Sequence, residues 1–399
     1  MKNLSCYKLN NFIFITFALL ISTQSVFSKP PDNAALLYYQ SFLMYYKPDN
    51  EMGKMLTDFR KGKTEVNEKI KQFVEKNRQA IDFALIAADQ STCDWGYDYS
   101  EGMDLTMPAL AKFRALVYLI VADAKVLAAQ GDYKMALERC LSIHKMSRHI
   151  VDKPLISYLV AIAMSEQANK CIQDILGGIP KDLRMLRWLK DKLSQIEGEF
   201  PPFKTCVSGE TEFIAIEKAK LKAETLSEML DDIAPASSTL KFLRDRLASA
   251  DKQFIDRNKN YLLVNYMGGV QAILDMSMPY PETYKQFKQL SADVQKDVVE
   301  NPDATLTAIF QHPFARIYSL AIRRQNLTRA VMAAIGVYIK WAQTGKLPDK
   351  LPAGLPKDLF SGKDFQYEKT ADSFILRCRG KNLADKKGKV YEYKFKVKK

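Results

Sequence analysis

Residues 110–176 most constrain the fold, because three long segments with apolar residues at helical spacing follow one another through very short connections. The first segment ends at Gly131, which can adopt the left-handed conformation that often closes a helix. Asp132 follows immediately and can cap the amino end of the next helix. The spacing therefore predicts a tight helical hairpin, followed by a third helix that Pro154 opens and that ends near Leu176.

Helical periodicity covers most of the remaining chain as far as Gly345, and the pattern then changes. Residues 374–378 and 390–397 are rich in aromatic and β-branched side chains, and the second of these segments alternates between apolar and charged residues, as strands do. We expect a mainly α protein, an irregular helical bundle or array with a small C-terminal antiparallel β module. The predicted domains are a helical domain at 29–345 and a β meander at 346–399 packed on the last helix.

The amino terminus has the pattern of a secretory signal peptide over residues 1–28. Lys2 and Lys8 precede an apolar run at 12–21, and cleavage is expected after Ser28. The run is shorter than the roughly 20 residues that a membrane-spanning helix needs. A retained signal anchor is the alternative. No later segment is long and apolar enough to span a bilayer, so we expect a periplasmic or secreted protein without a transmembrane segment in the mature chain.

The positive charge is concentrated at the carboxyl end. The chain has 59 Lys and Arg against 46 Asp and Glu, and ten of the basic residues but only two acids lie from Arg377 onward. Lys394, Lys396 and Lys398 share one face of the last predicted strand. Such lysines commonly protect an edge strand from pairing. The other interpretation is a basic surface for anionic lipid headgroups or acidic polymers, and an exported chain makes nucleic acid an unexpected partner.

Five cysteines follow the predicted signal peptide, an odd number for an oxidising compartment. Cys93 and Cys206 each lie in a predicted loop just before a helix, and a disulfide between them is one hypothesis. Cys140 and Cys171 lie on successive helices that turn near Asp152. Counting residues from that turn gives an axial offset of about 10 Å at 1.5 Å per residue, too far for a disulfide.

The loop at 91–107 is the longest polar interruption in the first half of the chain, and long ordered loops are often functional. It alternates aromatic and acidic residues, and the candidate ligand-binding side chains are Trp95, Tyr97, Asp98, Glu101 and Asp104. Stacking of a sugar or a peptide on Trp95 and Tyr97 is one interpretation. The other is that the aromatic rings plug the end of a helical bundle while the acids face water. The spacing of the acids fits no calcium loop.

Residues 33–46 form a predicted helix with an unusual aromatic content, namely Tyr38, Tyr39, Phe42, Tyr45 and Tyr46. These positions cover most of the helix circumference. The pattern is typical of a buried helix.

Sequence motifs for catalysis, metal binding or cofactor binding are almost entirely absent. Residues 238–241 match the Ser-x-x-Lys pattern of penicillin-binding enzymes, but capping of a helix by Ser238 is the better interpretation. The chain has no His-Glu-x-x-His, Gly-x-Ser-x-Gly, P-loop or dinucleotide glycine fingerprint. His144 and His149 are five residues apart, which does not place them on one helical face as a pair of metal ligands. We therefore predict no catalytic residue, no metal and no cofactor, and we interpret one of the two histidines as a buried, hydrogen-bonded residue.

The predicted hairpin resembles the turn between the two helices of a tetratricopeptide repeat, on the basis of Ala124, Gly131, Asp132, Tyr133, Ala136, Leu137 and Ile143. The resemblance covers one repeat, and no second copy follows at a fixed period, whereas a solenoid needs several. It implies a single repeat-like hairpin inside an irregular helical fold.

The C-terminal quarter resembles the globular part of type II secretion pseudopilins. The resemblance rests on the Gly-x-x-Pro element within 341–348 and on the Asp-x-Phe-x-Gly turn that leads into Phe-x-Tyr within 358–367. It implies a small β module packed on a helix. Residues 29–33 carry no prepilin cleavage motif, so assembly into a pseudopilus is not implied. The chain as a whole resembles a family of exported bacterial helical proteins.

These patterns favour an exported envelope protein that acts as a non-enzymatic helical scaffold or protein-interaction module. The expected partner is an envelope protein, or an anionic envelope polymer or lipid headgroup. The alternative is a carbohydrate-active hydrolase or lyase that uses the loop from Trp95 to Asp104. The oligomeric state is left open.

Overall fold

The computed structural model describes residues 32–218, 238–248 and 250–397. The chain divides into two units, Met1–Asp32 and Asn33–Lys399, and all described helices and strands belong to the second unit. The predicted signal peptide at 1–28 lies outside the described residues. Within the described ranges, no helix is both long and apolar enough to cross a membrane.

The second unit is mainly helical with one small sheet, which confirms the predicted fold class. Its α-helices are α2 (Ala34–Met44), α3 (Asn50–Arg60), α4 (Glu68–Lys76), α5 (Arg78–Ala88), α6 (Pro108–Ala129), α7 (Tyr133–His149), α8 (Leu155–Leu176), α9 (Leu183–Glu199), α10 (Phe203–Lys218), α12 (Ser238–Ala248), α13 (Lys252–Asn260), α14 (Gly268–Asp275), α15 (Tyr280–Glu300), α16 (Thr305–Phe310) and α17 (Phe314–Thr344). Two short 3-10 turns, η1 (Tyr99–Asp104) and η3 (Pro302–Ala304), and one π-helical segment, η2 (Tyr261–Met267), complete the helical part.

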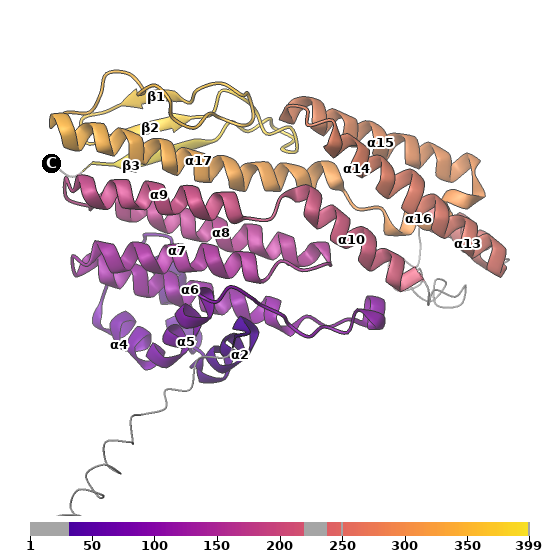
Figure 1. Cartoon of the computed structure of the whole chain (residues 1–399), viewed down its shortest axis with the longest axis horizontal. Helices are drawn as coiled ribbons and strands as arrows, with labels where there is room; N and C mark the ends of the chain where they lie inside the picture. The colour runs from indigo at the N-terminus through magenta and orange to yellow at the C-terminus, as the bar shows by residue number, and fades with distance from the viewer. Residues whose placement is uncertain (1–31, 219–237, 249, 398–399) are drawn as a thin grey trace, which may run out of the picture. The chain divides into compact units, whose positions relative to one another are not determined.

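The predicted hairpin forms the centre of this unit and is confirmed. Gly131 has a φ of +89°, which glycine adopts without the steric cost that a side chain would bring. The Asp132 carboxylate accepts a hydrogen bond of 3.2 Å from the amide of Met135 and so caps α7. α6, α7 and α8 pack on one another, and the long helix α17 packs on both α8 and α9 (Figure 1).

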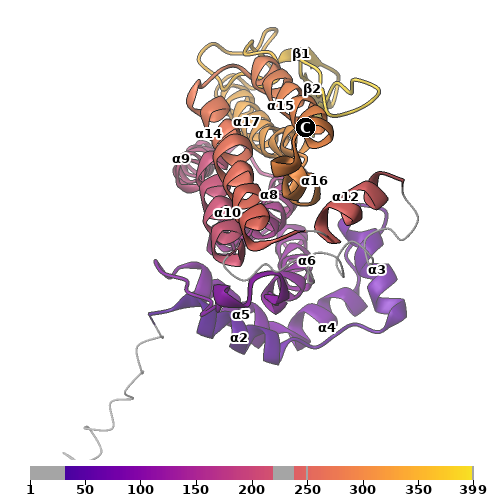
Figure 2. The same cartoon turned by 90° about the vertical axis from the view of Figure 1, so that its right-hand side faces the viewer.

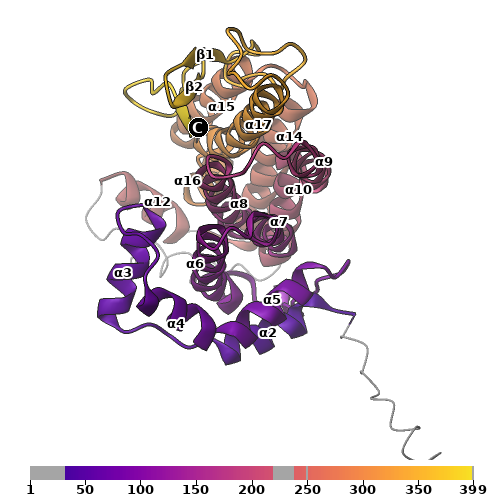
Figure 3. The same cartoon turned by 90° about the vertical axis from the view of Figure 1, so that its left-hand side faces the viewer.

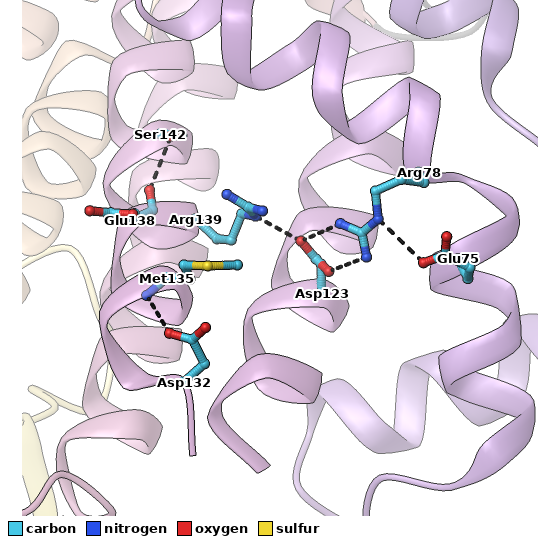
Figure 4. A network of polar contacts seen from close by, with 8 residues as sticks. All are labelled: Glu75, Arg78, Asp123, Asp132, Met135, Glu138, Arg139 and Ser142. Carbon is cyan, nitrogen blue, oxygen red and sulfur yellow. Dashed lines mark hydrogen bonds and ion pairs between the residues drawn. The ribbon is translucent and has the colours of Figure 1, made fainter. Parts of the chain in front are cut away.

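The helices α3, α4 and α5 pack against α6 of the central hairpin, and α2 packs on α5 (Figures 2 and 3). A buried ion pair connects this layer to the hairpin. Asp123 on α6 is only 1% exposed, and its carboxylate accepts hydrogen bonds from Arg78 on α5 and Arg139 on α7 (Figure 4).

The prediction that residues 33–46 form a fully buried helix is wrong for one face of α2. Ala34, Leu37 and Tyr38 are buried, whereas Leu36 is 52% exposed and Leu43 is 81% exposed. The apolar residues surround α2, but only α5 lies beside it as a main packing partner, so one apolar face has no cover among the described residues.

The helices α13 to α16 form a further layer, in which α15 packs on α14 and on α17. Buried Asn258 holds α13 to the start of α16. Its side-chain amide donates 3.1 Å to the carbonyl oxygen of Pro302, and its side-chain oxygen accepts 2.9 Å from the amide of Leu306.

The sheet consists of β1 (Gln366–Lys369), β2 (Ser373–Arg377) and β3 (Glu392–Lys396), antiparallel and in that order. Phe374 pairs with Phe395, and both side chains are buried. Along β3, Tyr393 and Phe395 face the core while Lys394 and Lys396 are exposed, which confirms the predicted alternation.

Two buried polar side chains hold the loops of the β module to the helices. The Asp358 carboxylate accepts from the amides of Phe360, Arg379 and Gly380 at 2.8–2.9 Å. Asn326 on α17 accepts 2.8 Å from the amide of Leu359. The sheet lies over α17 (Figure 1), and β3 also contacts α8, so the β module belongs to the same unit as the helices.

Candidate functional site

The aromatic side chains of the loop at 91–107 pack on one another rather than opening towards a ligand. Trp95 is 7% exposed, and its ring stacks on Tyr38 at 5.8 Å and on Tyr97 at 6.4 Å between centroids. The ring of Phe113 meets it edge-on, and the indole N–H donates 2.9 Å to the carbonyl oxygen of His149. The indole ring therefore has no free face on which a sugar could stack.

The acids of this loop do not converge on one point. Asp98, Glu101 and Asp104 are exposed, and Asp98 accepts 2.9 Å from the amide of Ser100, a local turn contact. In the described part of the chain, no group of three His, Cys, Asp or Glu residues could hold a metal ion. The arrangement matches the interpretation in which aromatic rings fill the end of the bundle and the acids face water.

The hypothesis of a disulfide between Cys93 and Cys206 is not supported by the structure, in which all five described cysteines are free thiols. Cys206 is buried on α10, and Cys93 is half-buried beside α2. Burial raises the pKa of each thiol to about 12. Neither sulfur is therefore a ready thiolate.

The large offset expected between Cys140 and Cys171 is wrong. The register of α7 and α8 is fixed by the contact of 3.1 Å between His144 Nδ1 and Ser165 Oγ. Ser165 lies ten residues into α8 and His144 only five residues before the end of α7, so the non-helical connection carries the chain past the end of α7 before α8 begins. The thiols of Cys140 and Cys171 consequently lie within hydrogen-bonding reach, and burial together with this neighbour raises the pKa of Cys140.

His144 and His149 are both buried and hydrogen-bonded, where the sequence predicted one such histidine. His144 accepts or donates at Ser165 Oγ, and His149 Nδ1 lies 2.9 Å from the hydroxyl oxygen of Tyr38. Burial lowers the pKa of His144 to about 3 and that of His149 to about 4, so both rings are neutral near pH 7.

A groove with a volume of 540 Å³ gathers lysines from distant parts of the chain, and we call it the lysine groove. Two of the predicted basic residues, Lys394 and Lys396 on β3, line it together with Lys61 at the end of α3 and Lys125 on α6. Its other lining residues are Gly62, Ala128, Ala129, Tyr133, Gln173, Asp174, Ile175, Gly177 and Gly178. The third predicted residue, Lys398, lies outside the described residues.

Close packing of β3 on the carboxyl end of α8 places the two lysines in the groove. The Gln173 side chain donates 2.8 Å to the carbonyl oxygen of Lys394. At Gly177, a Cβ would lie 2.9 Å from the carbonyl oxygen of Lys396, a distance that real Cβ atoms do not reach. Glycine is therefore required for the strand to approach the helix this closely.

The four lysines of the groove differ in their charge partners. Lys125 is 13% exposed and donates 2.6 Å to Asp174 and 3.0 Å to the carbonyl oxygen of Arg60, so its charge is balanced. Lys61, Lys394 and Lys396 are exposed, and within the described ranges none of them has an acidic group at ion-pair distance. The groove therefore has a surplus of positive charge.

Sequence reasoning identified Lys394 and Lys396 but missed Lys61 and Lys125. The first two follow from strand alternation near a basic terminus. The other two lie more than 250 positions earlier, and no local pattern distinguishes them from the other lysines of the chain.

Comparisons of the chain with protein-family models, with curated proteins and with solved structures find no match. The candidate site is therefore defined by its own residues and geometry.

Proposed function

We propose that this protein is an exported, non-enzymatic envelope scaffold that binds an anionic polymer in the lysine groove. One observation carries the proposal, namely that Lys61, Lys394 and Lys396 line one groove without an acidic partner among the described residues. Holding like charges close together costs free energy. A bound polyanion would offset that cost.

The origin of the lysines supports a polymer as the ligand. The three lysines without an acidic partner among the described residues come from the end of α3 and from β3, and they line one groove of 540 Å³. An extended chain with repeated carboxylates or phosphates can place a separate anionic group against each of them. The balanced pair of Lys125 and Asp174 and the ring of Tyr133, which also lines the groove, add polar and aromatic contact area.

The alternative, a hydrolase or lyase acting through the loop from Trp95 to Asp104, has less support. That function needs an accessible aromatic platform and convergent carboxylates. Trp95 is enclosed by aromatic rings, and the loop acids are dispersed.

Fluorescence anisotropy with fluorescein-labelled poly-L-glutamate tests the proposal. We expect the full chain to bind the polymer and the double variant Lys394→Glu, Lys396→Glu to bind at least tenfold more weakly. The matched control is Lys112→Glu with Lys285→Glu, two exposed lysines elsewhere that carry the same charge change. Affinity should fall steeply between 50 and 300 mM NaCl, because salt screens exposed charges.

Equal weakening by both double variants would show that only net charge matters and would refute the groove as the site. Labelled neutral dextran should not bind, and binding of dextran would favour the carbohydrate-directed alternative. The export part of the proposal predicts that protein recovered from the periplasm or the medium begins at Lys29.

A further inference from the structure

A second groove is lined mainly by apolar side chains, unlike the lysine groove. We call it the His312 groove. It has a volume of 550 Å³ and lies where the amino ends of α8 and α17 meet α10. Its apolar walls include Leu155, Ile156, Phe213, Ile317 and Leu320. Its polar groups are Glu210, His312 and Arg316. A mostly apolar depression of this size with a few polar groups has the character of a small-molecule site.

Glu210 and His312 form a fixed pair on one wall of the groove. Nε2 of His312 lies 2.8 Å from Oε1 of Glu210, and Oε2 of the same carboxylate accepts 2.6 Å from the amide of Leu155. Tyr266 donates 2.6 Å to the carbonyl oxygen of His312 and holds the backbone there. Both oxygens of Glu210 are thus engaged, and the carboxylate is 7% exposed.

Arg316 is the cation of this groove that has no partner. Its side chain is exposed, and in the described part of the chain its guanidinium makes no hydrogen bond and no ion pair. It stands in the first turn of α17, where the helix dipole disfavours a positive charge. No described hydrogen bond or ion pair therefore balances the charge of Arg316.

We propose that the His312 groove binds a single-chain amphiphile with an anionic headgroup, of the class of alkyl carboxylates. The carboxylate pairs with the guanidinium of Arg316, whose fork of donors matches two carboxylate oxygens. The alkyl chain lies along Ile156, Phe213 and Ile317 and is removed from water there. The proposal does not depend on the lysine groove, because the two grooves share no lining residue.

Isothermal titration of the full chain with dodecanoate, below its micelle concentration, tests this inference. We expect saturable binding that dodecanol, which has no charge, and acetate, which has no chain, do not reproduce. Shortening the chain to decanoate should weaken binding by up to about fifteenfold, because each buried CH₂ contributes ~0.8 kcal/mol, or about fourfold.

Two variants assign the site without disturbing the core. Arg316→Gln should weaken dodecanoate binding at least tenfold, and Ile156→Asp, at a position 52% exposed, should abolish it. The control Arg187→Gln removes an exposed arginine of α9 and should leave binding unchanged. The inference is overturned if the wild type does not bind dodecanoate, if dodecanol binds equally well, or if Arg316→Gln and Arg187→Gln bind alike.

Discussion

Replacing Asp123 by Asn should destabilise the protein substantially. The Asp123 side chain is 1% exposed and lies 3.0 Å from Nη2 of Arg78 and 2.8 Å from Nε of Arg139. Figure 4 shows the carboxylate between the two guanidinium groups. Asparagine keeps the shape of the side chain, but it removes the negative charge and leaves two cations facing each other.

The expected magnitude follows from the burial of each partner. Removing one member of a buried ion pair typically costs about 3–5 kcal/mol. The side chains of Arg78 and Arg139 are 33% and 16% exposed, so water can partly solvate them after the substitution. We therefore expect Asp123→Asn to lower the free energy of unfolding by about 3 kcal/mol, at the low end of that range.

Urea denaturation at pH 7, followed by circular dichroism, measures this loss. Urea is uncharged, so it does not screen the ion pair as guanidinium chloride would. Asp191→Asn is the matched control, since Asp191 on α9 is exposed and has no ion pair in the described ranges; its effect should be within about 0.5 kcal/mol. In the double variant Asp123→Asn, Arg139→Gln, the Arg139→Gln change should lower the free energy of unfolding by less than it does in the wild-type background. A loss below about 1 kcal/mol for Asp123→Asn would refute the reasoning.

Three further predictions concern packing and titration. Trp95→Ala should lower stability by about 3–5 kcal/mol in urea denaturation, because it empties a buried aromatic cluster, while Trp95→Phe costs clearly less. Gly380→Ala should also lower the free energy of unfolding, because its Cβ would lie 2.4 Å from the carbonyl carbon of Phe360. Gly345→Asn is the contrast and should cost less, because Gly345 has a left-handed φ with no atom near its Cβ position. His144→Gln should reduce the slope of stability against pH between pH 6.5 and 4, while His149 keeps its own contribution.

The sign of that pH dependence follows from the lowered pKa of His144. Its pKa is about 3 in the folded protein against 6.5 in the unfolded chain, so the unfolded chain binds the proton more readily. The stabilisation is complete above pH 6.5 and is lost as the pH falls towards 3, with a slope of up to about 1.4 kcal/mol per pH unit. If His144→Gln kept the wild-type slope, the lowered pKa of His144 would be contradicted. If Trp95→Ala or Gly380→Ala left the free energy of unfolding nearly unchanged, the packing argument for that residue would be contradicted.

Local sequence signals predicted the parts of the fold that local chemistry determines. Gly131 and Asp132 specify the hairpin through one positive φ and one cap, and the alternation along β3 identifies which side chains face the core. The burial of α2 was predicted too broadly, because apolar composition does not reveal whether a neighbour covers each face.

The sequence predicted two of the lysines of the candidate site but not how the site is assembled. Lys394 and Lys396 follow from the strand pattern, but their placement beside Lys61 depends on how β3 packs on α8 through Gly177. The contact between Cys140 and Cys171 was missed for a similar reason, since helix register depends on a non-helical connection whose length in space no residue count provides. Tertiary packing, rather than propensity, decides both.

Mapping lysine reactivity tests the lysine groove most directly. The full chain is treated with an amine-acetylating reagent with and without saturating poly-L-glutamate, and acetylation at each lysine is quantified by mass spectrometry. The account predicts that Lys61, Lys394 and Lys396 become protected by the polymer together, while exposed Lys112 and Lys285 react as before. Uniform protection of all exposed lysines, or protection of Lys112 and Lys285 alone, would contradict it.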